Sequence, residues 1–273
     1  MLNKNRKVEI LDTTLRDGSY TIGYQFNAKD TAIIARGLEL SGINRIEIGH
    51  GLGLGADRAG KGAQSVPDYI YMQACRNVLK KSVYGFFYIP EIGTIEDIEL
   101  LAGEGGKFIR IGISPNDIQG AITAVRYAKK SGLEVWINMM KSYAYPVDVC
   151  IECSTALIDN GADGVYVVDS AGGMLPNEVA RYVGEISNAL INYQDVPLIG
   201  FHGHENLGLG LACSLSAVQA GCNIVDGSLL GIGRSMGNTS TEGLAMVLSR
   251  ANIETGVDPW QVADLAEKLI RPF

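Results

Sequence analysis

Eight short apolar runs, rich in β-branched residues, recur along the chain and alternate with segments whose apolar residues have helical spacing. Each run predicts a buried strand, and successive runs start about one βα unit apart. Eight parallel strands with helical connections predict an α/β fold, a single-domain TIM (β/α)8 barrel over residues 1–273, although a doubly wound sheet has a similar pattern. The predicted strands are residues 8–11, 45–48, 83–89, 108–111, 134–139, 164–168, 198–201 and 223–225.

Three segments show the helical pattern most clearly. Apolar residues recur at helical spacing from residue 118 to residue 128, and residues 114–117 form a helix start signal before them. A second helix is predicted from Leu207 to Val218, ending at Gly221 directly before the eighth strand. The apolar residues between 260 and 270 are interpreted as the last barrel helix, with a dimer contact as the alternative.

The composition excludes several classes of partner. The net charge is −7 and no basic run could follow a phosphate backbone, so we expect no nucleic acid partner. No stretch reaches the ~18 apolar residues of a membrane helix, so we expect no membrane association. The five cysteines, an odd number, are expected to be free thiols in a reducing compartment, which indicates a cytoplasmic protein.

All three histidines follow or end predicted strands: His50 after the second strand, and His202 and His204 at the end of the seventh. Because alternate residues of a strand point to the same face, His202 and His204 present two imidazoles to one point, which suits a metal ion. The third ligand is expected to be a carboxylate, and Asp17 follows the first strand on the same face of a barrel. The sequence therefore predicts a metal centre at Asp17, His202 and His204.

Two neutral imidazoles and one carboxylate leave a divalent ion with a net positive charge and open coordination positions. Such an ion can chelate a 2-oxo acid and act as a Lewis acid that stabilises its enolate. Arg16, next to Asp17, provides a second permanent cation for the developing oxyanion. Lys141, after the fifth strand, is expected to reach the mouth of the barrel and to suit a second acidic group on the substrate.

The motifs around these residues resemble the DRE-TIM metallolyases, the HMG-CoA lyase-like barrels, and most closely the 4-hydroxy-2-oxovalerate aldolases. The resemblance covers residues 7–273. It implies Mn²⁺ or Mg²⁺ on the three predicted metal ligands, Arg16 facing the enolate, and Ser170 near the substrate. The motifs are Thr-Leu-Arg-Asp-Gly at 14–18, Glu-Ile-Gly-His-Gly-Leu-Gly-Leu-Gly at 47–55, Asp-Ser-Ala-Gly at 169–172, His-Gly-His-Glu-Asn-Leu at 202–207, and the segment from Asp-Gly-Ser-Leu at 226–229 to Gly-Asn at 237–238.

The sequence departs from this family at two places. Tyr20 stands where the aldolases have a catalytic histidine, and a phenol is a poor base near neutral pH, so we expect Tyr20 to donate a proton or to orient the substrate. The base role is open to His50, Tyr24 or a metal-bound hydroxide. The chain also ends at Phe273, before the further region with which those aldolases dock a dehydrogenase, so we expect no channelling dehydrogenase.

The leading hypothesis is a divalent-metal-dependent aldolase, or carbon–carbon lyase, that acts through the enolate of a pyruvate-type 2-oxo acid. Its partners are the small-molecule 2-oxo acid and an aldehyde, which together form a 4-hydroxy-2-oxo acid. The alternative is a Claisen-type acyltransferase that joins an acyl-CoA to a 2-oxo acid. Ser19 and Tyr20 argue against it, because the related condensing enzymes carry an acidic residue and Gln there.

A third hypothesis, from a different class, is a catalytically altered barrel that acts as a binding subunit. Tyr20 supports it, whereas the intact set of Asp17, His202 and His204 opposes it. The sequence is also compatible with a homodimer.

Overall fold

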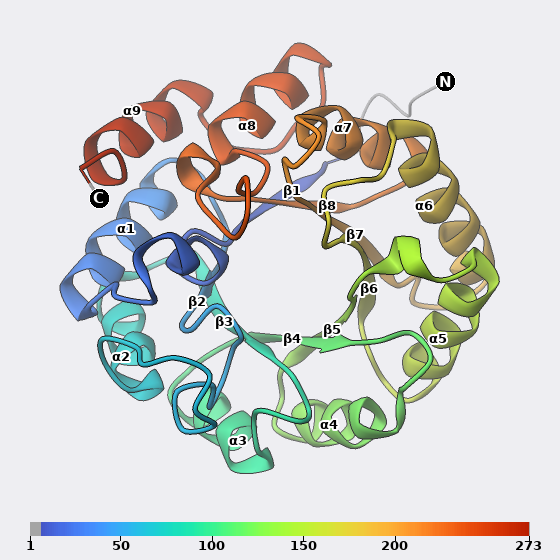
Figure 1. Cartoon of the computed structure of the whole chain (residues 1–273), viewed down its shortest axis with the longest axis horizontal. Coiled ribbons are helices and arrows are strands. Elements are labelled where there is room, and N and C mark those ends of the chain that lie inside the picture. The colour runs from blue at the N-terminus through green and yellow to red at the C-terminus, as the bar shows by residue number, and fades with distance from the viewer. Residues whose placement is uncertain (1–6, 273) are drawn as a thin grey trace.

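The eight predicted strands form one closed barrel in the computed structural model, which describes residues 7–272. Neighbouring strands pair in parallel from β1 to β8, and β8 pairs again with β1. The closed ring in Figure 1 confirms the TIM barrel and shows that the doubly wound sheet was the wrong alternative. The strands are β1 Glu9–Asp12, β2 Arg45–Ile48, β3 Val83–Tyr88, β4 Phe108–Ile113, β5 Glu134–Met139, β6 Gly164–Asp169, β7 Leu198–Gly203 and β8 Ile224–Gly227.

Helices surround the barrel and pack their apolar residues against the outer side of the strands (Figure 1). The first helix begins with a capping box, in which Asn27 and Asp30 each accept a hydrogen bond from the other's backbone N–H. The helices are α1 Ala28–Leu40, α2 Asp68–Val78, α3 Ile95–Gly103, α4 Gln119–Lys130, α5 Val147–Asp159, α6 Pro176–Leu190, α7 Gly210–Ala220, α8 Thr241–Arg250 and α9 Pro259–Leu269, with short 3-10 helices η1 Asp17–Ile22, η2 Ser142–Ala144 and η3 Leu229–Gly231.

Two helices begin later than predicted. α4 begins at Gln119 because the predicted start signal closes a separate turn, in which the N–H of Asp117 donates to the C=O of Ser114 at 2.9 Å. α7 begins at Gly210, and Leu207 lies in the preceding loop with 56% of its surface exposed. α7 ends before Gly221 as predicted, where a φ of 125° favours glycine.

The C-terminal segment forms a helix additional to the eight of the βα repeat. α8 is the helix that follows β8, and α9 packs against both α8 and α1 (Figure 1). Val262 and Ala266 of α9 are buried, whereas Trp260 is 74% exposed. A helix forms here as predicted, but the last helix of the repeat is α8, and α9 lies between it and α1. The alternative of a dimer contact stays a prediction.

The interior of the barrel is layered. Its lower layer is aromatic: the rings of Phe108 and Trp136 stack with centroids 5.1 Å apart, and Tyr166 lies 6.0 Å from Trp136. Two residues further along β4 and β8, on the same inward face, stand the buried charges of Arg110 and Asp226. Polar side chains therefore begin above an apolar plug and face the carboxyl ends of the strands, where TIM-barrel sites lie.

Two features of residues 7–272 bear on the expectations from composition. No helix there is both long enough and apolar enough to cross a membrane. The five cysteines are buried and form no disulfide with one another.

Trp136 provides a test of the apolar layer. Trp136→Ala is expected to lower the free energy of unfolding by about 3–5 kcal/mol, because a large buried ring is lost and a cavity remains. Trp136→Phe is the matched control, with a much smaller expected loss, since the indole Nε1 has no hydrogen-bond partner. Urea unfolding followed by circular dichroism measures both variants; equal losses would contradict this role of the ring.

Candidate metal centre and active site

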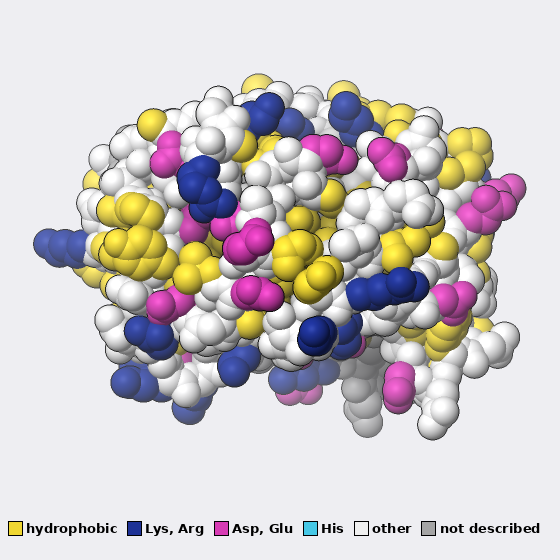
Figure 2. Space-filling view, turned by 90° about the horizontal axis from the view of Figure 1, so that it is seen from below, with side chains coloured by type: hydrophobic (Ala, Val, Ile, Leu, Met, Phe, Trp, Pro, Cys, Tyr) yellow, Lys and Arg dark blue, Asp and Glu magenta, His cyan; other side chains and the backbone are white. Residues whose placement is uncertain are grey.

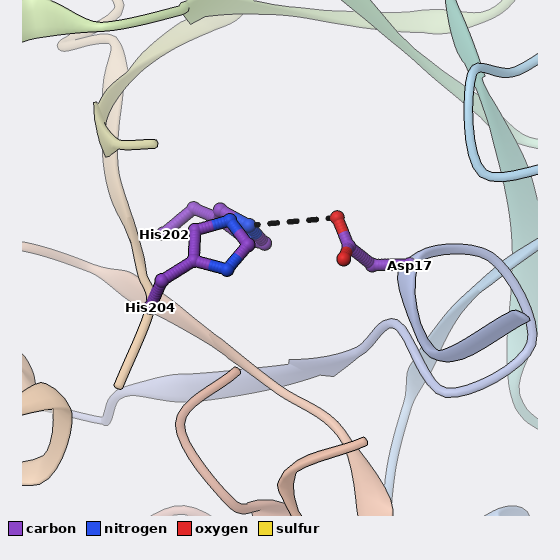
Figure 3. Close-up of side chains that lie close together, drawn as sticks. All are labelled: Asp17, His202 and His204. Carbon is purple, nitrogen blue, oxygen red and sulfur yellow. Dashed lines mark ion pairs between the residues drawn. The ribbon is translucent and has the colours of Figure 1, made fainter. Parts of the chain in front are cut away.

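Asp17, His202 and His204 come from distant parts of the chain and meet at the carboxyl end of the barrel (Figure 3). Asp17 opens η1 soon after β1, His202 lies on β7, and His204 directly follows that strand. One ligand atom of each lies within 4.8 Å of the others, and all three residues are buried. His202 Nε2 is 3.8 Å from Asp17 Oδ2. The three residues predicted as ligands therefore form one convergent cluster.

The donor atoms of this cluster fit a divalent metal ion. His202 Nδ1 lies 2.7 Å from Asp226 Oδ2, so that this nitrogen carries the proton and Nε2 keeps its lone pair for the cluster. His204 Nδ1 is buried without a hydrogen-bond partner, which costs free energy unless a ligand satisfies it. Two imidazoles and one carboxylate that leave coordination positions open are typical of catalytic metal sites.

Nearby charges keep the cluster in its metal-binding protonation state. Burial opposes the ionisation of Asp17, but Arg16 and the two histidines hold the pKa of this carboxyl well below its usual range. Burial, and then the neighbouring His202, lowers the pKa of His204 to about 4. Near neutral pH, Asp17 is therefore a carboxylate and His204 a neutral imidazole, the forms that bind metal.

Arg16 lies beside the cluster as a permanent cation. Its Nη1 pairs with Asp17, its Nε lies 2.6 Å from Glu47 Oε2, and its Cζ lies 4.8 Å from the centre of the Phe87 ring. Burial disfavours the charged guanidinium, but the carboxylates of Glu47 and Asp17 outweigh it and raise the pKa of Arg16. Arg16 therefore presents a fixed positive charge next to the metal ligands.

A buried network of charges supports the cluster from inside the barrel. Arg110, fully buried on β4, pairs with Asp226 on β8, and its Nη1 lies 3.5 Å from Glu47 Oε2. Asp226 thereby connects Arg110 to His202. Burial opposes the ionisation of Asp226, yet Arg110 and His202 lower its pKa. This carboxylate therefore holds His202 in one orientation.

A pocket opens to solvent above the metal ligands. Its space between atoms, including the open mouth, is about 470 Å³. Its walls combine charged groups with apolar ones, as small-molecule sites commonly do. The lining residues are Arg16, Asp17, Tyr20, Gly51, Leu52, Phe87, Ile89, Asn138, Met140, Val168, Ser170, His202, His204 and Arg234.

Of the other predicted catalytic residues, Tyr20 lines the pocket and His50 does not. Burial raises the pKa of Tyr20 to about 12, so the phenol keeps its proton near neutral pH. His50 is buried and stacks on Tyr24 with ring centroids 3.7 Å apart, and its Nδ1 accepts a hydrogen bond from the N–H of Leu52 at 3.0 Å. Burial lowers the pKa of His50, which favours its neutral form. The identity of the base stays a prediction.

The two predicted substrate-binding residues are linked to each other. Ser170 lines the pocket, and its Oγ accepts a hydrogen bond from the backbone N–H of Lys141 at 3.0 Å. The side chain of Lys141 is exposed and does not line the pocket. The backbone of Lys141 therefore contacts Ser170 at the wall of the pocket. A contact between the Lys141 side chain and the substrate stays a prediction.

Sequence reasoning assigned no role to four charged residues that the structure places in or below the site: Glu47, Arg110, Asp226 and Arg234. For Arg110, a signal existed, because a charged residue interrupts an apolar strand at an inward position. Arg234 lies in a loop with no periodic pattern that could have indicated its direction.

The fold and the site define the class of protein: a (β/α)8 barrel with a cluster of one aspartate and two histidines, at the carboxyl ends of its strands, whose donors fit a divalent metal ion. The family model described as HMGL-like matches residues 7–269. This chain therefore belongs to the HMGL-like family.

Named relatives are similar over almost the whole chain. A 4-hydroxy-2-oxovalerate aldolase of Carboxydothermus hydrogenoformans is 37% identical over 267 residues, which are 98% of this chain and 78% of that protein. The 4-hydroxy-2-oxovalerate aldolase 2 of Rhodococcus opacus is 37% identical over 268 residues, which are 98% of this chain and 76% of that protein. This chain is thus an enzyme of the aldolase and lyase type, as its sequence predicted.

A solved structure supports the fold independently. The HMG-CoA lyase of Bacillus subtilis is 19% identical, with a TM-score of 0.81 over 98% of this chain and 94% of that one. At this identity the likeness shows the barrel fold alone.

The hydrogen bond between Asp226 and His202 yields a prediction about metal affinity. Asp226→Asn is expected to weaken Mn²⁺ binding by about 10–100-fold, because the amide no longer fixes the imidazole or raises its basicity. Asp97→Asn is the matched control: Asp97 is also buried and pairs with an arginine, Arg58, but does not contact a metal ligand. Isothermal titration calorimetry measures both; equal affinities in the two variants would show that Asp226 does not support the metal site.

Proposed function

We propose that this enzyme is an aldolase that uses a divalent ion, Mn²⁺ or Mg²⁺, and acts through the enolate of a pyruvate-type 2-oxo acid. The observation that supports this most is the convergence of Asp17, His202 and His204, within 4.8 Å of one another, beside the guanidinium of Arg16. The aldolase names of the relatives favour this function over the acyltransferase and the binding subunit. We propose that residues 1–273 act as a single barrel domain.

The two metal-binding histidines and Asp17 would hold the ion, which supplies Lewis-acid polarisation of the keto group when it is bound. Arg16 lines the same pocket and adds a second positive charge where the keto oxygen gains electron density. Its pairs with Asp17 and Glu47 fix the guanidinium before the substrate arrives, so little reorganisation is needed.

The reaction we propose is the cleavage of a 4-hydroxy-2-oxo acid and its reverse. A base removes the proton of the 4-hydroxyl group, the C3–C4 bond breaks, and C4 leaves as an aldehyde. The electron pair of that bond passes into the enolate of the 2-oxo acid, whose C3 then takes up a proton. No oxidant or reductant is consumed. In the reverse direction, the enolate attacks the aldehyde and the new alkoxide is protonated.

We propose that two residues serve the proton transfers. Tyr20 lines the pocket and keeps its phenolic proton, so it suits protonation of the alkoxide in the condensation direction. His50 is neutral and stacks on Tyr24, whose ring centroid lies 5.1 Å from that of Tyr20. Because the Nδ1 of His50 already accepts a hydrogen bond from the N–H of Leu52 and ring contacts do not carry protons, we propose that His50 acts by positioning Tyr24 beside Tyr20.

Proton exchange of pyruvate tests the enolate chemistry directly. The metal-loaded enzyme is expected to exchange the methyl protons of pyruvate for deuterium in D₂O, followed by proton NMR. Removal of metal with EDTA, Asp17→Asn and His202→Ala should each slow the exchange by more than about 100-fold, because the Lewis acid is lost. Exchange at the wild-type rate in these samples would exclude a role for this metal centre.

Comparison of proton exchange with condensation separates the roles of Tyr20 and His50. Tyr20→Phe is expected to slow the condensation of pyruvate with an aldehyde by about 10²–10⁴-fold while exchange of the methyl protons continues, since the phenol acts on the alkoxide only. His50→Gln is expected to slow both steps. The opposite pattern, with exchange abolished by Tyr20→Phe and retained by His50→Gln, would reverse the two assignments.

A further inference from the structure

Arg234 lines the pocket from the loop between η3 and α8. Its Nη2 donates a hydrogen bond to the backbone C=O of Ser170 at 3.3 Å. Among residues 7–272, no carboxylate lies within ion-pair distance of this guanidinium, unlike that of Arg16. A guanidinium has about five N–H donors, and Arg234 is exposed, so most of its donors face solvent and can bind a ligand in place of water.

The loop that carries Arg234 is fixed to the site. Asn238 Nδ2 donates to Asp17 Oδ1 at 3.2 Å, and the backbone N–H of Met236 donates to Asn206 Oδ1 at 3.1 Å. The first bond ties the loop to a predicted metal ligand and the second ties it to the segment after β7. The backbone of Arg234 therefore has a defined position relative to the metal centre.

The charges around the pocket leave Arg234 unmatched. Asp17 and Glu47 bring two negative charges to the single positive charge of Arg16. Together with a singly charged 2-oxo acid, they match the charges of Arg16 and a divalent ion. Among residues 7–272 no carboxylate pairs with Arg234, so its charge remains unmatched and a further negative charge on the substrate would be favoured there.

The remaining walls carry no charge. Tyr20, Asn138 and Ser170 are polar, the other side chains are apolar, and the ammonium group of Lys141 lies outside the pocket. Because Arg16 already pairs with two carboxylates, Arg234 is the lining arginine that is left to pair with an anionic group of the substrate.

We propose that Arg234 recognises an anionic group, a carboxylate or a phosphate, at the end of the substrate opposite its 2-oxo acid. The aldehyde that the enzyme releases or consumes is then an acidic one. This inference rests on the proposed aldolase function and specifies its acceptor class.

Binding of paired 2-oxo acids to the Mn²⁺-loaded full chain tests whether Arg234 recognises a carboxylate at the far end of the substrate. Each pair has one chain length and differs in the terminal group: 2-oxoglutarate with 2-oxopentanoate, 2-oxoadipate with 2-oxohexanoate, and 2-oxopimelate with 2-oxoheptanoate. In at least one pair the dicarboxylate is expected to bind about tenfold more tightly, because a guanidinium–carboxylate pair is charge-assisted. Isothermal titration calorimetry measures each dissociation constant, so the test does not depend on turnover.

Rates of condensation with pyruvate test an anionic group on the aldehyde, either a phosphate or a carboxylate. Glyceraldehyde 3-phosphate is compared with glyceraldehyde, and succinic semialdehyde with butanal, as kcat/KM ratios. A preference of about tenfold for the charged member of either aldehyde pair supports the proposal. The absence of any preference for the charged member, in all the acid pairs and both aldehyde pairs, overturns it.

Three variants test whether the preference depends on Arg234. Arg234→Gln is expected to bring the ratio close to one, whereas Arg250→Gln, which removes an exposed arginine of α8 outside the pocket, should leave it unchanged. Arg234→Lys keeps the charge but not the planar guanidinium, so it should retain part of the preference. It also serves as a control for misfolding of the glutamine variant. A preference that survives Arg234→Gln contradicts the proposal. An Arg234→Gln variant that weakens the binding of both members of every pair equally also contradicts the proposal, because that result would mean that Arg234 binds the 2-oxo carboxylate.

Failure of the two proposals can be told apart. If pyruvate shows no metal-dependent proton exchange but the acid pairs show a preference that depends on Arg234, the aldolase function is wrong and the anion site stands. If exchange occurs and no preference is found, the aldolase function stands and the acidic acceptor is wrong.

Discussion

The ion pair between Arg110 and Asp226 is the interaction on which the arrangement of the barrel interior depends. Both groups are buried, so each would be costly without the other, and removal of one partner of such a pair typically costs about 3–5 kcal/mol. The ring of Tyr166 lies 4.3 Å from the Arg110 Cζ and adds a cation–π contact. The pair therefore divides the barrel into an aromatic lower layer and a polar upper layer that contains the site.

The same pair extends in two directions toward the site. Through Asp226 it reaches His202 Nδ1, and through Glu47 it reaches Arg16. One buried network thus fixes both the His202 imidazole of the predicted metal centre and the Arg16 guanidinium that lines the pocket. Because its members lie on different strands, the electrostatics of the site follow from the register of the sheet rather than from any single loop.

Periodicity made much of this structure predictable. The barrel could be expected from eight recurring apolar runs, and the convergence of His202 and His204 from their spacing of two residues on a strand. Asp17 could be placed with them because the carboxyl ends of all strands in a barrel lie on one face. These inferences depend only on local pattern and on a general rule of topology.

Other features depend on contacts that no local pattern specifies. Arg110 and Asp226 are 116 residues apart in the sequence, so their pairing follows from closure of the sheet. The direction of Arg234 depends on bonds of its loop to distant segments. The start of α4 was displaced because a turn at Ser114 competes with the helix, and local sequence cannot decide which forms.

The ligands of the predicted metal centre belong to the first and the seventh βα units, and β8 separates their strands. They become neighbours only when the last strand docks against the first and completes the ring. A chain that had folded only as far as β7 would already contain all three donors but would hold them apart. An ion bound by this predicted centre would therefore report ring closure, and part of the free energy of its coordination would contribute to holding the two ends of the sheet together.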